Sequence, residues 1–399
     1  MDIHVFPSSG LCGIISVSTD KSISHRALML AAISNGISVI HNLSDSADVL
    51  STQSCLQQLG IKMVQNGSST IVHGVGIHGL KKPDEILDAG NSGTTMRLLT
   101  GLLAGQNFNT VISGDSSLSK RPMKRIITPL KQMGANIEAS ENGTAPLKIN
   151  SAQLNPIHYH SPVASAQVKS CILLAGLLAK GRTSVTEPYK SRDHTERMLP
   201  DFGVKIESNE LTVSVNGQAQ LGSTEITIPG DISSAAFFLV GAAIVPGSEL
   251  VLKNIGLNPT RTGIIDVLQQ MGADISISES AAGQNEPIGD ITIKTSHLKG
   301  IEIKAPQIPK LIDELPIIAI AATRATGKTT VSGAGELRVK ESDRLRAMCA
   351  NLQAMGINIT EKDDGFEIIG PQFFRGATVS SDSDHRIAMA FAIAGLAAN

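Results

Sequence analysis

The sequence predicts an α/β (α+β) protein of two domains, in which apolar helices form the interior and sheets and amphipathic helices lie outside them. Three observations predict this fold class. An amphipathic helix that ends at a glycine and leads into a strand occurs five times. An apolar, Ala-rich helix precedes each copy. Two similar linkers lie three copies apart. A chain of 399 residues is also too long for one ordinary hydrophobic core.

The glycine of each copy closes a Leu-x-x-x-Gly sequence, at Gly60, Gly134, Gly203, Gly272 and Gly356. The helical spacing before the glycine and the β-branched residues after it indicate a helix end and a strand start. We expect each glycine to adopt the left-handed conformation that commonly closes a helix. An order of elements that returns along the chain is typical of a repeat architecture.

The apolar helices each lead through a Gly turn into a β-branched strand, in residues 26–40, 96–112, 168–185, 235–251 and 316–331. Helices that are apolar on every side are buried, so we expect these helices to form the interior. A sixth copy begins at Ile387, and the sequence ends at Asn399 before the glycine of that copy. We therefore expect six units, of which the sixth is incomplete.

The two similar linkers, residues 17–24 and 228–235, each lead from a strand through an aspartate into a buried helix. Their spacing of three units predicts two domains of three units each. We expect residues 20–227 to form one domain, and residues 1–19 with 228–399 to form the other, whose last unit is truncated. Two chain crossings make a hinge, and we expect the functional site in the cleft between the domains.

The composition excludes several classes of function. A formal net charge of −2, the absence of Trp and only two Tyr argue against nucleic-acid binding. No apolar run is long enough to span a membrane, and the polar, acidic start is no signal peptide. The four cysteines lack paired spacing, which fits a reducing cytoplasm and argues against structural zinc. We expect a cytoplasmic protein without metal, nucleic-acid or membrane partners.

Cationic loops recur at one point of the repeated unit, in residues 21–26, 120–125, 190–197, 338–346 and 384–386. One such cluster alone is usually a solvated face. Because the clusters are in register, we expect the fold to gather them on one face. Small polar residues at 91–95 and 165–167 begin two apolar helices and offer backbone N–H groups to an anion, although they also suit ordinary capping.

The cationic loop before Leu345 begins a helix, which Ser342 or Asp343 can cap. Arg344 and Arg346 in the first turn oppose the helix dipole, so this loop favours an anionic ligand. The alternative is local ion pairing of Arg344 with Glu341 and of Arg346 with Asp343, three residues apart in each case.

Three carboxylates are candidates for acid–base chemistry. Asp313 and Glu314 stand just before a buried helix with Pro316 in its first turn, and Glu341 is next to Lys340. A carboxylate at a helix start is often a simple N-cap. A partly buried carboxylate among cations can instead act as a general base or acid.

Three sequence patterns resemble known nucleotide-binding or metal-binding motifs but lack the surrounding structure that those motifs require. The GxGxxG match at residues 74–79 opens no long helix, and the P-loop-like ending at 327–330 has Ala322 in place of the first glycine and runs from helix to strand. His158 and His160 have no third ligand in view, so we expect an ordinary strand pair. A kinase built on residues 327–330 is kept as an alternative.

In order along nearly the whole chain, seven segments resemble motifs of the bacterial EPSP synthase family of enolpyruvyl transferases: residues 20–26, 91–94, 120–123, 165–170, 191–196, 338–344 and 384–386. The related UDP-N-acetylglucosamine enolpyruvyl transferases share the fold but lack this set, and they are the alternative. The resemblance implies a two-domain inside-out α/β barrel of βαβαββ units.

The resemblance also implies an activity, 3-phosphoshikimate 1-carboxyvinyl transfer. The enolpyruvyl group of phosphoenolpyruvate moves to the 5-hydroxyl of shikimate 3-phosphate, and phosphate is released. This is a step of the shikimate pathway toward chorismate and the aromatic amino acids. The implied enzyme is a cytoplasmic monomer that needs no metal or cofactor and is the target of glyphosate.

Residue roles are carried over by motif. The resemblance assigns shikimate 3-phosphate to Lys21, Ser22, Arg26, Ser165, Ala166, Gln167, Arg192, Asp313 and Lys340. It assigns phosphoenolpyruvate to Lys21, Gly93, Arg121, Gln167, Arg344 and Arg386. Asp313 is the implied base for the 5-hydroxyl. Glu341, with Lys21, is the implied proton donor to the methylene carbon.

The chain departs from the family pattern in two places. Ser18-Thr19 stands where the family usually has Pro-Gly, as this chain has at Pro229-Gly230. The family also continues beyond the position of Asn399 with a strand, a Lys that touches phosphoenolpyruvate and a helix. An inactive, anion-binding homologue is therefore a further hypothesis.

Overall fold

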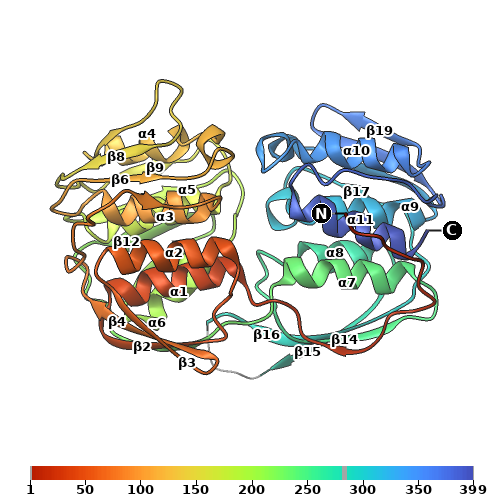
Figure 1. The fold of residues 1–399 in the computed structure, drawn as a ribbon, viewed down its shortest axis with the longest axis horizontal. Coiled ribbons are helices and arrows are strands. Elements are labelled where there is room, and N and C mark those ends of the chain that lie inside the picture. The colour runs from red at the N-terminus through yellow and green to blue at the C-terminus, as the bar shows by residue number, and fades with distance from the viewer. Residues whose placement is uncertain (1, 281–284, 399) are drawn as a thin grey trace. The chain divides into compact units, whose positions relative to one another are not determined.

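The computed structural model describes residues 2–280 and 285–398, which form a mixed α/β fold (Figure 1). These residues contain eleven α-helices and five four-stranded sheets. They divide into two compact units. Unit 2 comprises residues 19–229 and 283–286, and unit 1 comprises residues 1–18, 230–282 and 287–399, with only the described residues considered in each.

Unit 2 contains three of the sheets and six of the helices in the described chain. The first sheet is β13 (Glu225–Thr227), β2 (Asn35–His41), β4 (Ser69–Val75) and β3 (Lys62–Asn66). The second is β5 (Leu87–Asp88), β6 (Thr110–Ser113), β8 (Leu147–Asn150) and β7 (Asn136–Glu138). The third is β11 (Ile206–Asn209), β12 (Thr212–Asn216), β10 (Arg182–Thr186) and β9 (His158–His160). The helices are α1 (Lys21–Ile33), α2 (Ala47–Gln58), α3 (Gly93–Leu103), α4 (Lys124–Gln132), α5 (Ala166–Gly176) and α6 (His194–Asp201), with a 3₁₀ turn at Leu118–Lys120.

Unit 1 contains the other two sheets of the described chain. One is β1 (Cys12–Ile15), β14 (Glu249–Gly256), β16 (Ile288–Lys294) and β15 (Asp274–Ser280). The other is β17 (Glu302–Ile303), β18 (Gly327–Val331), β20 (Gly365–Gly370) and β19 (Ile359–Lys362). The helices are α7 (Ile232–Ile244), α8 (Gly263–Gln270), α9 (Leu315–Arg324), α10 (Arg344–Ala354) and α11 (His385–Leu396), with 3₁₀ turns at Ile308–Lys310 and Gly335–Val339.

Every sheet of the described chain has the same topology. One edge strand pairs in parallel with its neighbour, and the other pairings are antiparallel. In unit 2, α1 and α3 lie between the sheet that contains β6 and β8 and the sheet that contains β2, β3 and β4 (Figure 1). The same strand pairing recurs because the same sequence of helix, strand and glycine recurs.

The apolar helices form the interior of each unit, as predicted. In unit 2, α3 packs against α5 and α1, and in unit 1, α7, α9 and α11 pack against one another. Residues 23–33 of α1 are all buried. On α9, Ile317, Ile318 and Ile320 are fully buried, which contributes about 1.5–3 kcal/mol for each side chain.

The five helix-closing glycines adopt the predicted left-handed conformation. Their φ angles are +89° at Gly60, +92° at Gly134, +79° at Gly203, +89° at Gly272 and +82° at Gly356. Each glycine follows an amphipathic helix, namely α2, α4, α6, α8 and α10. The conformation is costly for any residue with a Cβ, which explains why glycine recurs there.

Each of the three motif-like patterns includes strand residues. Residues 327–331 form β18, which pairs antiparallel with β20, so they do not form the loop of a P-loop site. Gly74 lies within β4, and His158 and His160 lie on β9 with their rings stacked at a centroid separation of 4.5 Å. Among the described residues, no cluster of three or more metal-ligating side chains occurs. No described helix has the length and apolarity required to cross a bilayer.

Candidate active site

In unit 2 the predicted residues gather at the beginnings of three buried helices. Lys21 and Ser22 open α1, Gly93 opens α3, and Ala166 and Gln167 open α5. Capping side chains fix all three helix starts, because Asp20 accepts from the Ile23 N–H at 2.8 Å, Ser92 from Thr95 at 3.1 Å and Ser165 from Val168 at 3.4 Å. Helix beginnings carry partial positive charge and unsatisfied N–H groups, and this arrangement suits anionic ligands.

Arg26 is a buried cation that donates hydrogen bonds to neutral groups. Its Nε donates to Thr195 Oγ1 at 2.7 Å, its Nη1 to the Ser22 carbonyl at 2.9 Å and its Nη2 to Ser170 Oγ at 2.7 Å. Burial lowers the pKa of Arg26 to about 10, and the positive charge of Arg192 acts in the same direction. The guanidinium remains protonated at neutral pH, so the site holds a desolvated positive charge that an anionic ligand stabilises.

Lys21 is paired with Asp48 on α2 at 2.7 Å, and both side chains are partly exposed. The sequence patterns did not single out Asp48. A ligand phosphate that approaches Lys21 competes with this carboxylate. Arg192 is partly buried in the segment between β10 and α6, near enough to Arg26 to lower its pKa.

Gln167 is held by side chains of α3. Arg97 Nη1 donates to Gln167 Oε1 at 2.5 Å, and Gln167 Nε2 donates to Thr94 Oγ1 at 3.0 Å. These two bonds fix the orientation of the amide between α3 and α5. Arg97 and Thr94 were not among the predicted site residues, although both lie within or beside the 91–94 motif.

Gly93 leaves room for two guanidinium groups. A Cβ at this position would lie 3.0 Å from Arg97 Nη1 and 3.4 Å from Arg121 Nη1. Arg121 donates through Nη2 to Asn91 Oδ1, so the 120–125 loop and the 91–95 helix start meet, as the sequence predicted. Two cations beside the start of α3, where no side chain intervenes, make this a favourable place for a small anion.

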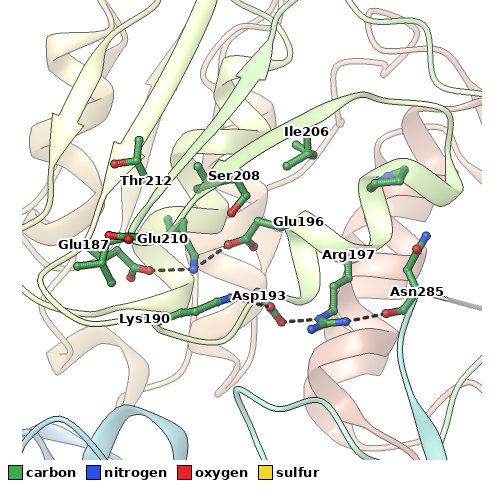
Figure 2. Close-up of a pocket in the computed structure, with 14 residues that line it drawn as sticks. Glu187, Lys190, Asp193, Glu196, Arg197, Ile206, Ser208, Glu210, Thr212 and Asn285 are labelled. Carbon is green, nitrogen blue, oxygen red and sulfur yellow. Dashed lines mark hydrogen bonds and ion pairs between the residues drawn. The ribbon is translucent and has the colours of Figure 1, made fainter.

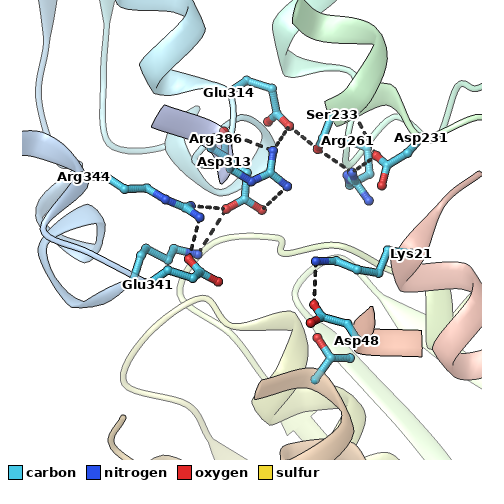
Figure 3. A network of polar contacts seen from close by, with 12 residues as sticks. Lys21, Asp48, Asp231, Ser233, Arg261, Asp313, Glu314, Glu341, Arg344 and Arg386 are labelled. Carbon is cyan, nitrogen blue, oxygen red and sulfur yellow. Dashed lines mark hydrogen bonds and ion pairs between the residues drawn. The ribbon is translucent and has the colours of Figure 1, made fainter. Parts of the chain in front are cut away.

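In unit 1 the predicted residues surround the buried guanidinium of Arg344 (Figure 3). Its Nε bonds Asp384 at 2.7 Å, its Nη1 bonds Asp313 at 3.1 Å, and its Nη2 bonds Glu341. Burial acts to lower the pKa of Arg344, but the carboxylates of Glu341, Asp313 and Asp384 outweigh it and raise the pKa. The predicted local pair with Glu341 is therefore present, and Arg344 also joins three separate segments.

Asp313 lies among three cations. Its carboxylate accepts from Lys340 at 3.4 Å and from Arg344 at 3.1 Å, and Arg386 Nη2 lies 3.9 Å away. Nearby positive charges favour the ionised form of a carboxylate. Figure 3 shows Asp313 pointing toward Arg344 and Arg386, so these cations hold its carboxylate in one orientation.

The helix-cap interpretation of Glu314 is wrong. Glu314 occupies the N-cap position of α9, with Pro316 in the first turn, but its side chain makes no capping bond. Instead one carboxylate oxygen accepts from Ser233, whose hydroxyl accepts in turn from Arg261 at 2.8 Å. Arg261 also pairs with Asp231, the N-cap residue of α7, at 2.9 Å. Of this buried network only Glu314 was singled out from the sequence as a chemical group.

The predicted pairing of Asp343 with the Arg346 side chain is replaced by two other contacts. Asp343 is the N-cap residue of α10 and accepts from the backbone N–H of Arg346 at 3.0 Å. Its carboxylate pairs with Arg338 at 3.0 Å, and Arg338 also pairs with Glu361 at 2.8 Å. Arg338 thus joins the N-cap residue of α10 to β19.

Nine of the predicted residues lie in unit 2 and five lie in unit 1. Unit 2 holds Lys21, Ser22, Arg26, Gly93, Arg121, Ser165, Ala166, Gln167 and Arg192, and unit 1 holds Asp313, Lys340, Glu341, Arg344 and Arg386. The first group consists of cations and helix starts, and the second adds the carboxylates. All three candidate carboxylates, Asp313, Glu314 and Glu341, therefore lie in unit 1, and cations lie in both units.

Residues 5–399 match the family model for EPSP synthase (3-phosphoshikimate 1-carboxyvinyltransferase). The chain belongs to the EPSP synthase family. It is 54% identical over 389 residues to the 3-phosphoshikimate 1-carboxyvinyltransferase of Bacillus thuringiensis (strain Al Hakam), and the match covers 97% of this chain and 91% of that relative. The enzyme of the same name from Bacillus cereus (strain ATCC 10987 / NRS 248) has the same identity and coverage.

Solved structures of EPSP synthases have the same fold. An EPSP synthase structure from Acinetobacter baumannii is 48% identical, with a TM-score of 0.88 over 99% of this chain and 92% of that chain. A second structure from the same organism is 47% identical, with a TM-score of 0.87. The mixed α/β prediction is confirmed by this likeness.

Proposed function

We propose that this EPSP synthase family member transfers the enolpyruvyl group of phosphoenolpyruvate to the 5-hydroxyl of shikimate 3-phosphate and releases phosphate. The observation that carries the proposal is the gathering of the helix starts of α1, α3 and α5 with the cations Lys21, Arg26 and Arg121, because both substrates are multiply anionic. The family membership supports the same reaction class, and it does not favour a UDP-sugar transferase or an inactive homologue.

The residues of unit 2 bind the charged groups of shikimate 3-phosphate. Arg26 and Arg192 supply guanidinium groups to the phosphate, and the α5 start supplies the Ser165 hydroxyl and the backbone N–H groups of Ala166 and Gln167. Lys21 and Ser22, at the start of α1, also bind shikimate 3-phosphate. Lys340 and Asp313 contact the ring hydroxyls.

Phosphoenolpyruvate is held by Lys21, Gly93, Arg121, Gln167, Arg344 and Arg386. Guanidinium groups bind carboxylate and phosphate with two parallel hydrogen bonds, which gives orientation as well as affinity. The absence of a side chain at Gly93 allows the substrate to approach the Arg121 guanidinium, which a Cβ would meet at 3.4 Å. Arg344 exchanges one of its three carboxylate partners for the substrate.

The chemistry is an addition followed by an elimination. Asp313 accepts the proton of the 5-hydroxyl, whose oxygen bonds to carbon 2 of phosphoenolpyruvate. Glu341, assisted by Lys21, gives a proton to carbon 3, so carbon 3 becomes a methyl group. A proton then leaves carbon 3, the bond from carbon 2 to the phosphate oxygen breaks, and the enol ether and inorganic phosphate result.

We also propose the finer architecture and the setting of the enzyme. Each of two domains, residues 20–227 and residues 1–19 with 228–399, follows the inside-out barrel plan of βαβαββ units. The recurrent sheet topology and the buried helices support this plan. The enzyme works as a monomer in the cytoplasm, and glyphosate inhibits it because Gly93 leaves room for the inhibitor.

The test is direct detection of products. Phosphate release is measured from phosphoenolpyruvate with shikimate 3-phosphate, and the enol ether is identified by NMR. We expect both products in equal amounts. Phosphate release that requires a UDP-sugar in place of shikimate 3-phosphate would favour the alternative transferase. Binding of shikimate 3-phosphate without turnover would favour the inactive homologue.

A further inference from the structure

Unit 2 contains a buried group of three charges that the reaction above does not use. Lys169 on α5 lies between Glu187 and Glu196, with Nζ at 2.8 Å from Glu187 Oε2 and at 2.7 Å from Glu196 Oε1. The side chains of Lys169 and Glu187 are only 4% and 2% exposed. Figure 2 shows the two carboxylates on either side of one nitrogen, at the edge of a cavity of about 330 Å³.

A buried ion pair is costly to assemble, because both charges lose their contact with water. Burial disfavours the charged form of Lys169, but the carboxylates of Glu196 and Glu187 outweigh it and raise the pKa of the amine. The amine therefore stays protonated between its two carboxylates. The charge of Glu196 also acts on Arg26 and favours its protonated form.

Glu187 differs from Glu196 in what else it contacts. Glu187 Oε1 accepts from the backbone N–H of Ser165 at 3.0 Å and from the hydroxyl of Ser191 at 2.6 Å. Its Oε2 accepts from the Ser191 N–H at 3.3 Å. One carboxylate thus binds the N-cap residue of α5 and the segment that leads into α6.

The segment that Glu187 holds is residues 187–193, between the end of β10 and the start of α6. It lies outside helices and strands, so side chains form hydrogen bonds with its backbone N–H and C=O groups. The Lys169 amine adds a bond to the Ser191 carbonyl at 3.4 Å. Ser191 directly precedes Arg192, and Ser165 directly precedes Ala166 and Gln167.

We propose that Glu187, held in place by Lys169, is a positioning residue that sets the α5 start and the Arg192 segment together for the phosphate of shikimate 3-phosphate. The inference rests on the proposed function, because it assigns that phosphate to Ser165 and Arg192. Glu187 touches neither substrate in this account. It acts by fixing the distance between two substrate-binding segments, which the chain itself connects only through the length of α5 and β10.

The test compares Glu187→Gln with Glu196→Gln, a matched pair in which each variant removes one carboxylate charge from the same lysine. We expect Glu187→Gln to raise KM for shikimate 3-phosphate about tenfold, as for the loss of one charge-assisted hydrogen bond, with kcat and KM for phosphoenolpyruvate within about twofold. Glu196→Gln changes KM for shikimate 3-phosphate by less than about threefold. Equal increases in the two variants would show that only the buried ion pair matters, and would overturn the proposal.

Direct binding separates this inference from the function itself. The dissociation constant of shikimate 3-phosphate is measured by calorimetry in the absence of phosphoenolpyruvate, and the same tenfold difference is expected. If the wild-type chain binds shikimate 3-phosphate but does not turn over, the two variants still test the positioning role. If the wild-type chain does not bind it, the proposed function and this inference both fail.

A milder variant covers the case in which Glu187→Gln does not fold. Ser191→Ala removes one donor to Glu187 and keeps every charge. We expect KM for shikimate 3-phosphate to rise about threefold, less than for full loss of a hydrogen bond to a charged group, because the Ser191 N–H still donates to Glu187. An unchanged KM in a folded Ser191→Ala protein would contradict the proposal.

Discussion

Replacement of Gly93 by alanine tests the proposed phosphoenolpyruvate site with one methyl group. The added Cβ lies 3.0 Å from Arg97 Nη1 and 3.4 Å from Arg121 Nη1. Both atoms are the far ends of flexible side chains, so the guanidinium groups shift and the fold tolerates the change. We expect the free energy of unfolding to change by less than about 1 kcal/mol, since alanine suits a helix at least as well as glycine.

The Gly93→Ala substitution instead weakens the binding of phosphoenolpyruvate. If the shift removes one charge-assisted hydrogen bond to phosphoenolpyruvate, about 1.5–3 kcal/mol is lost, and KM for phosphoenolpyruvate rises about 10- to 100-fold. We expect glyphosate to inhibit the wild-type chain and to lose more affinity than the substrate does in the variant. Steady-state kinetics with each substrate varied in turn, with and without glyphosate, measure both effects.

Gly241→Ala on α7 is the matched control. Its Cβ would meet Leu11 Cδ1 at 3.0 Å and Ile393 Cδ1 at 3.4 Å, so the crowding is equal in distance but involves apolar side chains outside the predicted site. We expect this variant to leave KM for phosphoenolpyruvate and the inhibition by glyphosate unchanged. A Gly93→Ala protein with the same KM and the same inhibition as wild type would refute the reasoning about Gly93.

Three further predictions follow from named contacts. Glu341→Gln lowers kcat by about 100-fold or more, as for the loss of a general acid, while the dissociation constant of shikimate 3-phosphate stays within about threefold; equal losses in both would return Glu341 to a structural role. Arg344→Met leaves the fully buried Asp384 without its cation and lowers the free energy of unfolding by about 3–5 kcal/mol in denaturant titration. An unchanged midpoint of denaturant unfolding would contradict the conclusion that Arg344 joins three segments of unit 1. Burial lowers the pKa of His25 from 6.5 to about 3, so the unfolded chain binds the extra proton and stability falls as pH drops below 6.5, by about 2 kcal/mol from this group at pH 5. His25→Asn, which can keep a bond to Thr52, should show a shallower loss between pH 6.5 and 5, and an identical slope would count against this cause.

The repeated pattern predicts the buried helices and their glycine ends because these depend on local sequence. Apolar residues on every face require burial, and a glycine after a helix end readily adopts positive φ. The helix starts could also be predicted from the sequence, since Asp20 and Ser165 stand just before apolar runs and cap the helices in the structure. Such features need no knowledge of distant parts of the chain.

The polar contacts between residues far apart in the chain could not be predicted from local sequence. Arg97 lies in an apolar helix and meets Gln167, 70 residues away in sequence, and the Arg344 contact to Asp384 spans 40 residues. Nothing local in the sequence distinguishes Asp384 from an ordinary N-cap, which it also is. Glu314 looked like a cap because of Pro316, and only the packing of α7 shows that Ser233 takes its carboxylate. Pairings of this kind are set by how the elements pack.

The addition–elimination mechanism is tested most directly by following hydrogen at carbon 3 of phosphoenolpyruvate. The reaction is run in deuterium oxide with shikimate 3-phosphate, and the vinyl group of the product is examined by NMR. We expect deuterium in the methylene group, because a solvent-derived proton from Glu341 is added at carbon 3 before one is removed. Formation of the enol ether without any deuterium at carbon 3 would contradict the addition–elimination mechanism and the role of Glu341 in it.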